Sequence, residues 1–214
     1  MSLRGIYGGT FDPIHLGHLR TAWEVAVTID MPVHMVLART PPHRDQPSAG
    51  PEHRWAMLNL ALEGQQRLHP DDRELRRQGR SYMIDTVDSF SEQYGGVPCL
   101  ILGQDAATGL DRWHRWRELL DRVHLVIMTR PGGHDLPVAP ELGDLLNERE
   151  VAGPAQLRRS EGPALWRCQV SALEISATAI RLQLLQGSLP RYQVPGKVLN
   201  YIRKHALYRA ESRI

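Results

Sequence analysis

Residues 8–18 read Gly8-Gly9-Thr10-Phe11-Asp12-Pro13-Ile14-His15-Leu16-Gly17-His18, and the rest of the chain can be understood around this stretch. An apolar run from Leu3 to Tyr7 precedes it, and apolar residues recur at helical spacing from Leu16 to Val27 after it. The segment therefore predicts a β-strand, then a turn that contains glycine, then an α-helix. Both histidines are expected in the first turn of that helix.

The turn and the helix start have the composition of a phosphate-binding site. The first N–H groups of a helix lack partners within the helix, and the positive end of its dipole lies there, so both favour an anion. Gly8 and Gly9 allow a ligand to approach the backbone closely, and Pro13 fixes the chain before the helix. His15 and His18 share one helical face, where their imidazoles can donate hydrogen bonds to phosphate oxygens.

Three simpler interpretations of this stretch stay open. The glycines could only form a tight turn, and either histidine could be an ordinary surface residue in a chain that has ten. The pair could also ligate zinc, but the metalloprotease helix has histidines four apart with a glutamate between them, and no cysteine or acidic ligand is nearby. We therefore predict no protein metal site. The strand, glycines, proline and paired histidines in one block favour phosphate binding.

Composition limits the class of protein. The chain has 214 residues, 42% of them hydrophobic, which is enough for one large α/β domain spanning 1–214. Lys plus Arg number 26 and Asp plus Glu 24, so no strongly basic surface points to nucleic acid. Cys99 and Cys168 lie in apolar runs and are expected to be buried and reduced. With no leader sequence and no membrane-length apolar run, we expect a cytoplasmic protein.

Strands and helices are expected to alternate along the rest of the chain. Further strands are predicted at 33–38, 98–102, 123–128 and 165–170, and helices at 51–62, 81–94, 113–120, 141–148, 175–186 and from Pro195. The order predicts an α/β fold with a doubly wound parallel sheet of about five strands and helices on both faces. The charged stretch 71–77 predicts a solvated segment or a short edge strand. Neither a Gly-x-Gly-x-x-Gly fingerprint nor a P-loop motif is present.

Three polar groups follow predicted strands, where ligands gather in such sheets. His43 and Arg44 follow the strand at 33–38, on the expected ligand side, and a solvated basic loop would be the favoured interpretation only if the first motif were absent. Asp105 follows the strand at 98–102 and is either a ligand for ribose hydroxyls or a helix N-cap. Arg130 follows the strand at 123–128, where its guanidinium could bind a carboxylate or phosphate. Farther along, Ser176 is a predicted N-cap.

Several blocks together resemble one known family. Residues 8–18 look like the signature of the nucleotidylyltransferase superfamily, whose His-x-Gly-His element opens the first helix. Ile175-Ser176-Ala177-Thr178-Ala179-Ile180-Arg181 resembles its C-terminal Ser-x-Thr-x-Ile-Arg motif, within a helical part at about 175–214. With Pro41-Pro42-His43-Arg44 and Gly103-Gln104-Asp105, the chain is similar to the bacterial nicotinate-mononucleotide adenylyltransferases of NAD biosynthesis. The resemblance spans almost the whole chain and implies a Rossmann-like fold.

The resemblance implies transfer of AMP from ATP to nicotinate mononucleotide, with Mg²⁺ and release of pyrophosphate. His18 and His15 would be the catalytic residues. The implied ATP-binding residues are Gly8, Gly9, Thr10, Phe11, His15, His18, Gly103, Asp105, Ile175, Ser176, Thr178 and Arg181. The implied residues for nicotinate mononucleotide are Thr10, His43, Arg44, Tyr82, Met83, Ile84, Asp105, Trp113 and Arg130. Trp113 would stack on the pyridine ring, and the backbone of 82–84 would contact its carboxylate.

Two alternatives to this activity remain. An adenylyltransferase with the same first motif could act on the amidated nucleotide or on phosphopantetheine. A nucleotide sensor on the same fold could bind ATP without catalysis. We expect small-molecule substrates, and neither nucleic acid, nor membrane, nor an obligate protein partner.

Overall fold

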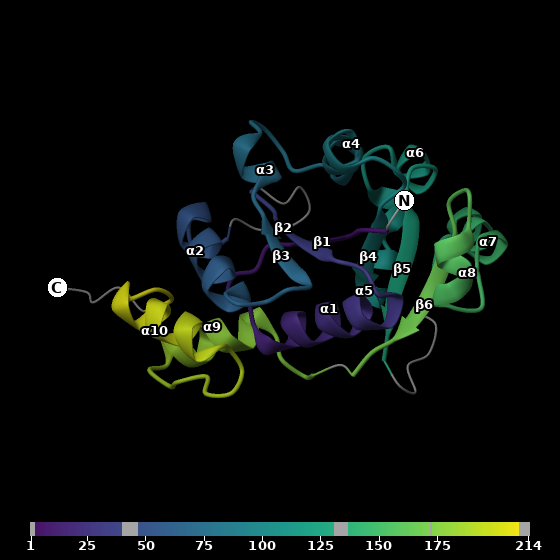
Figure 1. The fold of residues 1–214 in the computed structure, drawn as a ribbon. Coiled ribbons are helices and arrows are strands. Elements are labelled where there is room, and N and C mark those ends of the chain that lie inside the picture. The colour runs from purple at the N-terminus through teal and green to yellow at the C-terminus, as the bar shows by residue number, and fades with distance from the viewer. Residues whose placement is uncertain (1–2, 40–46, 131–136, 172, 210–214) are drawn as a thin grey trace.

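The structure is a computed structural model that describes residues 3–39, 47–130, 137–171 and 173–209. A parallel sheet of six strands runs through its centre in the order β3-β2-β1-β4-β5-β6 (Figure 1). The strands are β1 (Gly5–Gly9), β2 (Val33–Leu37), β3 (Leu68–Asp71), β4 (Cys99–Gly103), β5 (His124–Thr129) and β6 (Leu165–Gln169). The predicted doubly wound α/β fold is confirmed.

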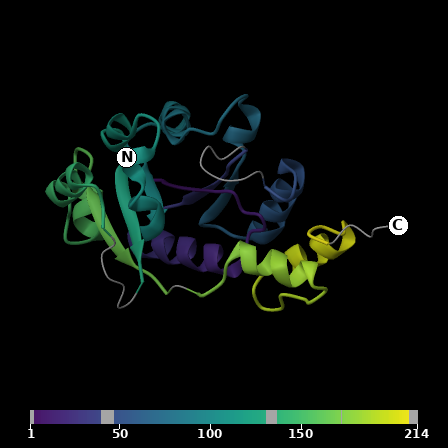
Figure 2. The ribbon, with the colours of Figure 1, turned by 180° about the vertical axis from the view of Figure 1, so that it is seen from behind.

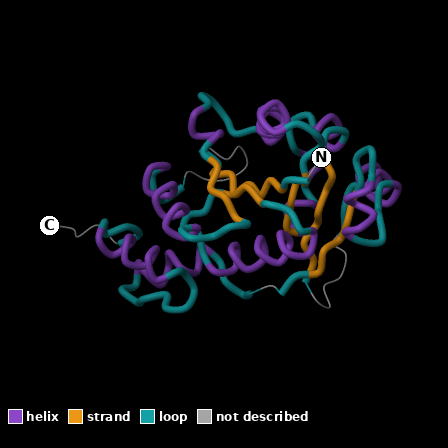
Figure 3. Tube along the Cα trace, viewed as in Figure 1, coloured by secondary structure: helices purple, strands orange, loops and turns teal. Residues whose placement is uncertain are grey.

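Helices cover both faces of the sheet, as the alternation of the strand side chains requires. Along β5, Leu125 and Ile127 pack into one apolar cluster, whereas Val126 and Met128 pack into the other. The first face carries α4 (Met83–Tyr94), α5 (Gln104–Ala107), η1 (Leu110–Arg112), α6 (Trp116–Leu120) and α7 (Pro140–Glu148). The second carries α1 (Leu16–Ile29), α2 (Pro51–Leu62), α8 (Pro154–Arg159), α9 (Ala177–Leu185) and α10 (Gly196–Lys204) (Figures 2 and 3).

The strand order reverses between β1 and β4, which are paired neighbours in the centre of the sheet. From β1 the chain adds β2 and then β3 on one side of the sheet, and from β4 it adds β5 and then β6 on the other side. In open α/β sheets the loops beyond the carboxyl ends of such strands diverge and leave a crevice for ligands. The loop after Gly9 and the loop after Gly103 lie at this position.

Three sequence predictions of secondary structure were wrong in detail. The sheet has six strands and not about five, because Leu68–Asp71 forms an edge strand of only four residues that includes Pro70. The helix expected at 113–120 begins only at Trp116, after Arg115 takes a left-handed φ of 55°. Ser81 does not cap α4: Tyr82 is the N-cap residue, and Ser81 Oγ accepts a hydrogen bond from Arg39 N.

Two short helices also escaped the sequence analysis. α3 (Arg73–Arg76) forms within the charged stretch that was read as a solvated segment or an edge strand, and α8 lies in the region between β5 and β6. Neither segment is long enough to show a clear apolar periodicity. Among the described residues, no helix combines the length and the apolarity needed to cross a membrane.

Candidate active site

The two histidines of the first motif are held against each other at the start of α1. His15 is the N-cap residue, and its Nδ1 accepts a hydrogen bond from the backbone N–H of His18 at 3.3 Å. The two imidazole rings stack with their centroids 3.6 Å apart and their planes 22° apart. A Cβ on Gly17 would lie 3.0 Å from Nδ1 of His15, so the glycine of His-x-Gly-His makes room for this cap. The motif is a structural unit.

Burial and the cap hydrogen bond decide the chemical state of His15. Its side chain is buried, and desolvation lowers the pKa of His15 from the usual 6.5 to about 4. His15 is therefore neutral near pH 7. Because Nδ1 accepts the hydrogen bond from His18 N, the single ring proton belongs on Nε2. A neutral donor, and not an imidazolium, is available at this position.

Lowering the pH is expected to destabilise the protein through His15. The His15 imidazole takes up a proton near pH 6.5 in the unfolded chain and near pH 4 in the folded chain. Folding with a neutral His15 therefore contributes its full stabilisation above pH 6.5, and this contribution is lost as the pH falls toward 4. Between pH 7 and pH 5 the free energy of unfolding should fall by about 2 kcal/mol from this group. In His15→Asn the side chain can still accept the capping hydrogen bond but no longer takes up a proton. Urea unfolding of this variant should therefore show a smaller fall in the free energy of unfolding between pH 7 and pH 5. An equal fall in the free energy of unfolding of the wild type and of His15→Asn would contradict the low pKa assigned to His15.

The helix start offers fewer free backbone donors than the sequence suggested. Leu16 N donates to the carbonyl oxygen of Gln193 at 2.8 Å, and His18 N donates to the His15 ring. Both are donors that the sequence analysis assigned to an incoming anion. A phosphate at this site would therefore be bound more by side chains than by the first turn of backbone.

Phe11 and the two glycines shape the turn that precedes the histidines. Phe11 has a left-handed φ of 45°, and its buried ring meets His18 edge-on with centroids 5.2 Å apart. A Cβ on Gly9 would lie 2.5 Å from the Phe11 ring, and one on Gly8 would lie 2.8 Å from the terminal methyl of Met83. The glycines thus make room for protein side chains. Met83, one of the residues expected to bind nicotinate mononucleotide, therefore lies beside the end of β1.

The C-terminal motif, Ile175 to Arg181, lies directly against the first motif. Ser176 is the N-cap of α9, as predicted, and its Oγ accepts from Ala179 N at 3.1 Å. Arg181 crosses to the β1–α1 turn, where Nη1 donates to the carbonyl oxygen of Asp12 at 2.8 Å. Its Nη2 lies 3.4 Å from Oγ1 of Thr178, which is exposed. The carbonyl of Ile175 lies 3.5 Å from the Cβ position of Gly17. Folding therefore brings together two motifs at opposite ends of the sequence.

The remaining predicted residues lie along the same edge of the sheet or outside the described part. Asp105 is exposed in the first turn of α5, whose N-cap is Gly103, so the N-cap alternative for Asp105 is wrong. Trp113 is half-buried just after η1, and the next residue, His114, lies 4.3 Å from the Tyr82 ring, centroid to centroid. Arg130 follows β5 and is exposed. His43 and Arg44 lie outside the described residues.

Arg54 is a residue of this site that the sequence analysis missed. It is only 1% exposed, and its guanidinium donates to four carbonyl oxygens at 2.7–3.1 Å, those of Thr10, Ala38, Arg39 and Ala49. These carbonyls belong to the loops that follow β1 and β2 and to the segment before α2. Burial lowers the pKa of Arg54, and the nearby Asp12 carboxylate opposes that effect. One signal was available, because Arg54 shares the buried stripe of Met57, Leu58 and Leu62 on α2.

The fold and the paired motifs are those of a nucleotide-binding α/β protein, and comparison with known proteins agrees. Residues 6–183 match the family described as cytidylyltransferase-like, so the chain belongs to that family. A "probable nicotinate-nucleotide adenylyltransferase" of Methylococcus capsulatus is 41% identical over 95% of this chain and 98% of its own length. One of Pseudomonas aeruginosa is 43% identical over 96% and 97%. Within the cytidylyltransferase-like family, the chain belongs with the nicotinate-nucleotide adenylyltransferases.

Solved structures show the same fold. The nicotinic acid mononucleotide adenylyltransferase of Plasmodium falciparum, complexed with NaAD, superposes with a TM-score of 0.72 over 97% of this chain and 98% of that one, at 17% identity. The same enzyme complexed with APC gives a TM-score of 0.69, with the same coverage and identity. At this identity the likeness establishes the arrangement of elements and not the residues of the site.

Proposed function

We propose that this protein is a nicotinate-nucleotide adenylyltransferase, which transfers AMP from ATP to nicotinate mononucleotide and releases pyrophosphate. The observation that carries this proposal is the contact between the two phosphate motifs, where Arg181 of α9 donates to the Asp12 carbonyl beside the stacked histidines. An extended polyphosphate could bridge these motifs. The sequence relatives that bear this activity in their names, at 41% and 43% identity, support the same substrate pair.

The reaction makes modest demands on the protein. An oxygen of the 5′-phosphate of nicotinate mononucleotide attacks the α-phosphorus of ATP in line and forms the new P–O bond. The bond from that phosphorus to the bridging oxygen of the pyrophosphate group breaks, and pyrophosphate leaves with the electron pair. The nucleophile is already an anion, so no general base or covalent intermediate is needed. Catalysis then consists of positioning and stabilisation of the charge that builds on the phosphates.

The described side chains divide between the two substrates. His15 and His18 would donate to the phosphates of ATP, with His18 the first choice for the transition state, while Ser176, Thr178 and Arg181 would hold the β- and γ-phosphates. Asp105, exposed at the carboxyl end of β4, would accept hydrogen bonds from ribose hydroxyls. The nicotinate end would lie near Tyr82 and Trp113, where a flat ring can stack and Arg130 can approach the carboxylate.

Mg²⁺ fits this site only as a companion of the phosphates. Within the described ranges, no group of three or more His, Cys, Asp or Glu side chains could hold a metal ion. The carboxylate within the turn, that of Asp12, already accepts hydrogen bonds from Ser48 N, Ala49 N and the Tyr208 hydroxyl. We propose that phosphate oxygens of ATP would hold Mg²⁺, which would supply positive charge to offset the negative charge on the leaving pyrophosphate. The chain contributes the imidazoles and the guanidinium.

A cytoplasmic location is also proposed. Cys99 and Cys168 are buried, and burial raises the pKa of each thiol, to about 12 and about 11. Such thiols stay protonated and unreactive, as suits a compartment that keeps cysteines reduced. ATP, the proposed substrate, is abundant there.

The test is pyrophosphate release from ATP and Mg²⁺ by the purified protein, in parallel reactions with nicotinate mononucleotide, nicotinamide mononucleotide and phosphopantetheine. Strong preference for the nicotinate form is expected. Preference for another acceptor would make the substrate assignment wrong. ATP binding without pyrophosphate release from any acceptor would place the protein among nucleotide sensors.

A further inference from the structure

The buried side chain of Asp12 is the centre of a cluster of hydrogen bonds that joins distant parts of the chain. It is only 5% exposed; Oδ2 accepts from Ser48 N at 2.7 Å, and Oδ1 accepts from Ala49 N at 3.2 Å. The Tyr208 hydroxyl, 196 residues away in sequence, donates to Oδ1 at 2.6 Å. The backbone carbonyl of Asp12 accepts from Arg181. We call Asp12, Ser48, Ala49, Arg181 and Tyr208 the Asp12 cluster.

Tyr208 reaches the cluster because α10 ends in a turn that reverses the chain. Leu207 N donates to the carbonyl of Ile202 and Ala206 N to that of Arg203, while Ala206 has a φ of 50°. These are the two hydrogen bonds and the left-handed residue of a Schellman motif, here with alanine where glycine is usual. Tyr208 itself has a φ of 60°, which is uncommon for an aromatic residue. Leu207 and Tyr208 then pack against the same apolar cluster as α1 and α2.

The contact lies where it can influence both phosphate motifs. Asp12 stands three residues before the N-cap His15 in sequence, and its carbonyl holds Arg181. A buried carboxylate keeps one geometry only while its donors are in place. Burial and then the Asp12 charge raise the pKa of Tyr208 well above its usual range, so its hydroxyl keeps its proton near neutral pH and can donate to Asp12. The C-terminal turn thus braces the turn that carries the first motif.

We propose that Tyr208 is a positioning residue for the ATP site: its hydroxyl fixes Asp12, and Asp12 in turn fixes the relative placement of the His15–His18 helix start and Arg181. The proposal rests on the proposed function for its substrate. It assigns no contact between Tyr208 and ATP. Loss of the hydroxyl should therefore loosen triphosphate binding and its alignment, and leave nicotinate mononucleotide binding unchanged.

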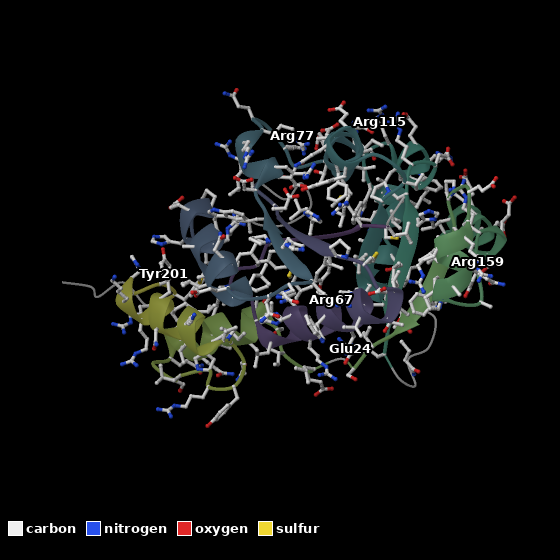
Figure 4. All side chains as sticks on the ribbon, in the orientation of Figure 1. Glu24, Arg67, Arg77, Arg115, Arg159 and Tyr201 are labelled. Carbon is white, nitrogen blue, oxygen red and sulfur yellow. The ribbon has the colours of Figure 1, made fainter. Side chains whose placement is uncertain are left out.

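The experiment compares Tyr208→Phe with Tyr201→Phe. Tyr201 lies on α10 (Figure 4), and its hydroxyl bonds Nδ1 of His53 at 3.0 Å, so this variant also removes one hydroxyl hydrogen bond from the C-terminal region. In Tyr208→Phe, kcat/KM for ATP should fall about 10-fold, the scale of one lost hydrogen bond to a charged group. The KM for nicotinate mononucleotide should stay within about 2-fold in both variants. Tyr201→Phe should keep the wild-type kcat/KM for ATP within the same range.

The two possible failures are separated by measuring ATP affinity directly, by equilibrium titration without an acceptor. If the wild-type protein binds ATP but forms no dinucleotide, the proposed function is wrong, and weaker ATP binding by Tyr208→Phe than by Tyr201→Phe would still support the role of Tyr208. Equal ATP affinity and equal kcat/KM in the two variants would overturn that role. Adding Tyr208→Phe to Asp12→Asn should cost little more than Asp12→Asn alone, because both changes act on one contact. Full additivity would also overturn it.

Discussion

His18→Ala is expected to lower turnover by about 10²–10³-fold, the scale of removing one preorganised donor from a developing anion. The structure places the His18 ring against His15 on one side and edge-on to Phe11 on the other, so the imidazole is held before substrate arrives. Alanine removes the donor, whereas the His15 cap uses only the backbone N–H of residue 18 and is retained. The measurement is steady-state pyrophosphate release with saturating ATP and nicotinate mononucleotide.

A matched control removes an imidazole elsewhere. His69 lies on the edge strand β3, where its ring contacts that of His34 with centroids 5.4 Å apart. His69→Ala should leave turnover within about 2-fold, since no step of the proposed reaction involves β3 side chains. Near-normal turnover in His18→Ala, at substrate concentrations that saturate the variant, would make the catalytic assignment wrong.

Of the variants proposed here, Arg54→Met is expected to lose the most stability, about 3–5 kcal/mol in the free energy of unfolding. Methionine fills much of the volume but leaves four carbonyl oxygens without their donor. It also removes one of the two cations that the described residues place near the buried Asp12 carboxylate, so that of these only Arg181, whose Nη1 lies 3.9 Å from Asp12 Oδ2, remains there. For a chain of this size, the midpoint of thermal unfolding should drop by about 10 °C or more. Urea unfolding at pH 7 gives the free energy, and a thermal scan gives the midpoint.

Arg67→Met is the comparison at the surface. Arg67, which is labelled in Figure 4, forms an ion pair with Asp30 at 2.8 Å, and both side chains are substantially exposed. The same substitution there should change the free energy of unfolding by less than about 1 kcal/mol. If Arg54→Met were no more destabilising than Arg67→Met, the four hydrogen bonds of Arg54 would not contribute as the geometry requires.

Short-range patterns in the sequence predicted several local features correctly. Apolar runs such as 98–102 and 123–128 predicted strands because a parallel strand covered on both faces is apolar at every position. His15, Gly17 and His18 lie within one turn of helix, so their spacing alone predicted that the two imidazoles share a face. Ser176 was predicted as an N-cap because a hydroxyl just before a helix has a local partner. Each of these features depends on residues a few positions apart.

Features that depend on contacts between distant residues were not predicted. Strand β3 is a strand because Leu68–Asp71 pairs with β2, although its own four residues show little strand character. The helix-start donor of Leu16 is engaged by Gln193, which no local pattern reveals.

Local sequence patterns were enough to predict the class of fold and to show the two motifs, 8–18 and 175–181, at opposite ends of the chain. The hydrogen bonds by which Arg54 links the loops after β1 and β2, and the one from the Tyr208 hydroxyl to Asp12, became visible only in the folded chain. The physical reason is that a buried charge is stable only where the fold supplies its partners, and those partners come from loops far apart in the chain. A sequence shows that the residues exist, and folding determines which of them meet.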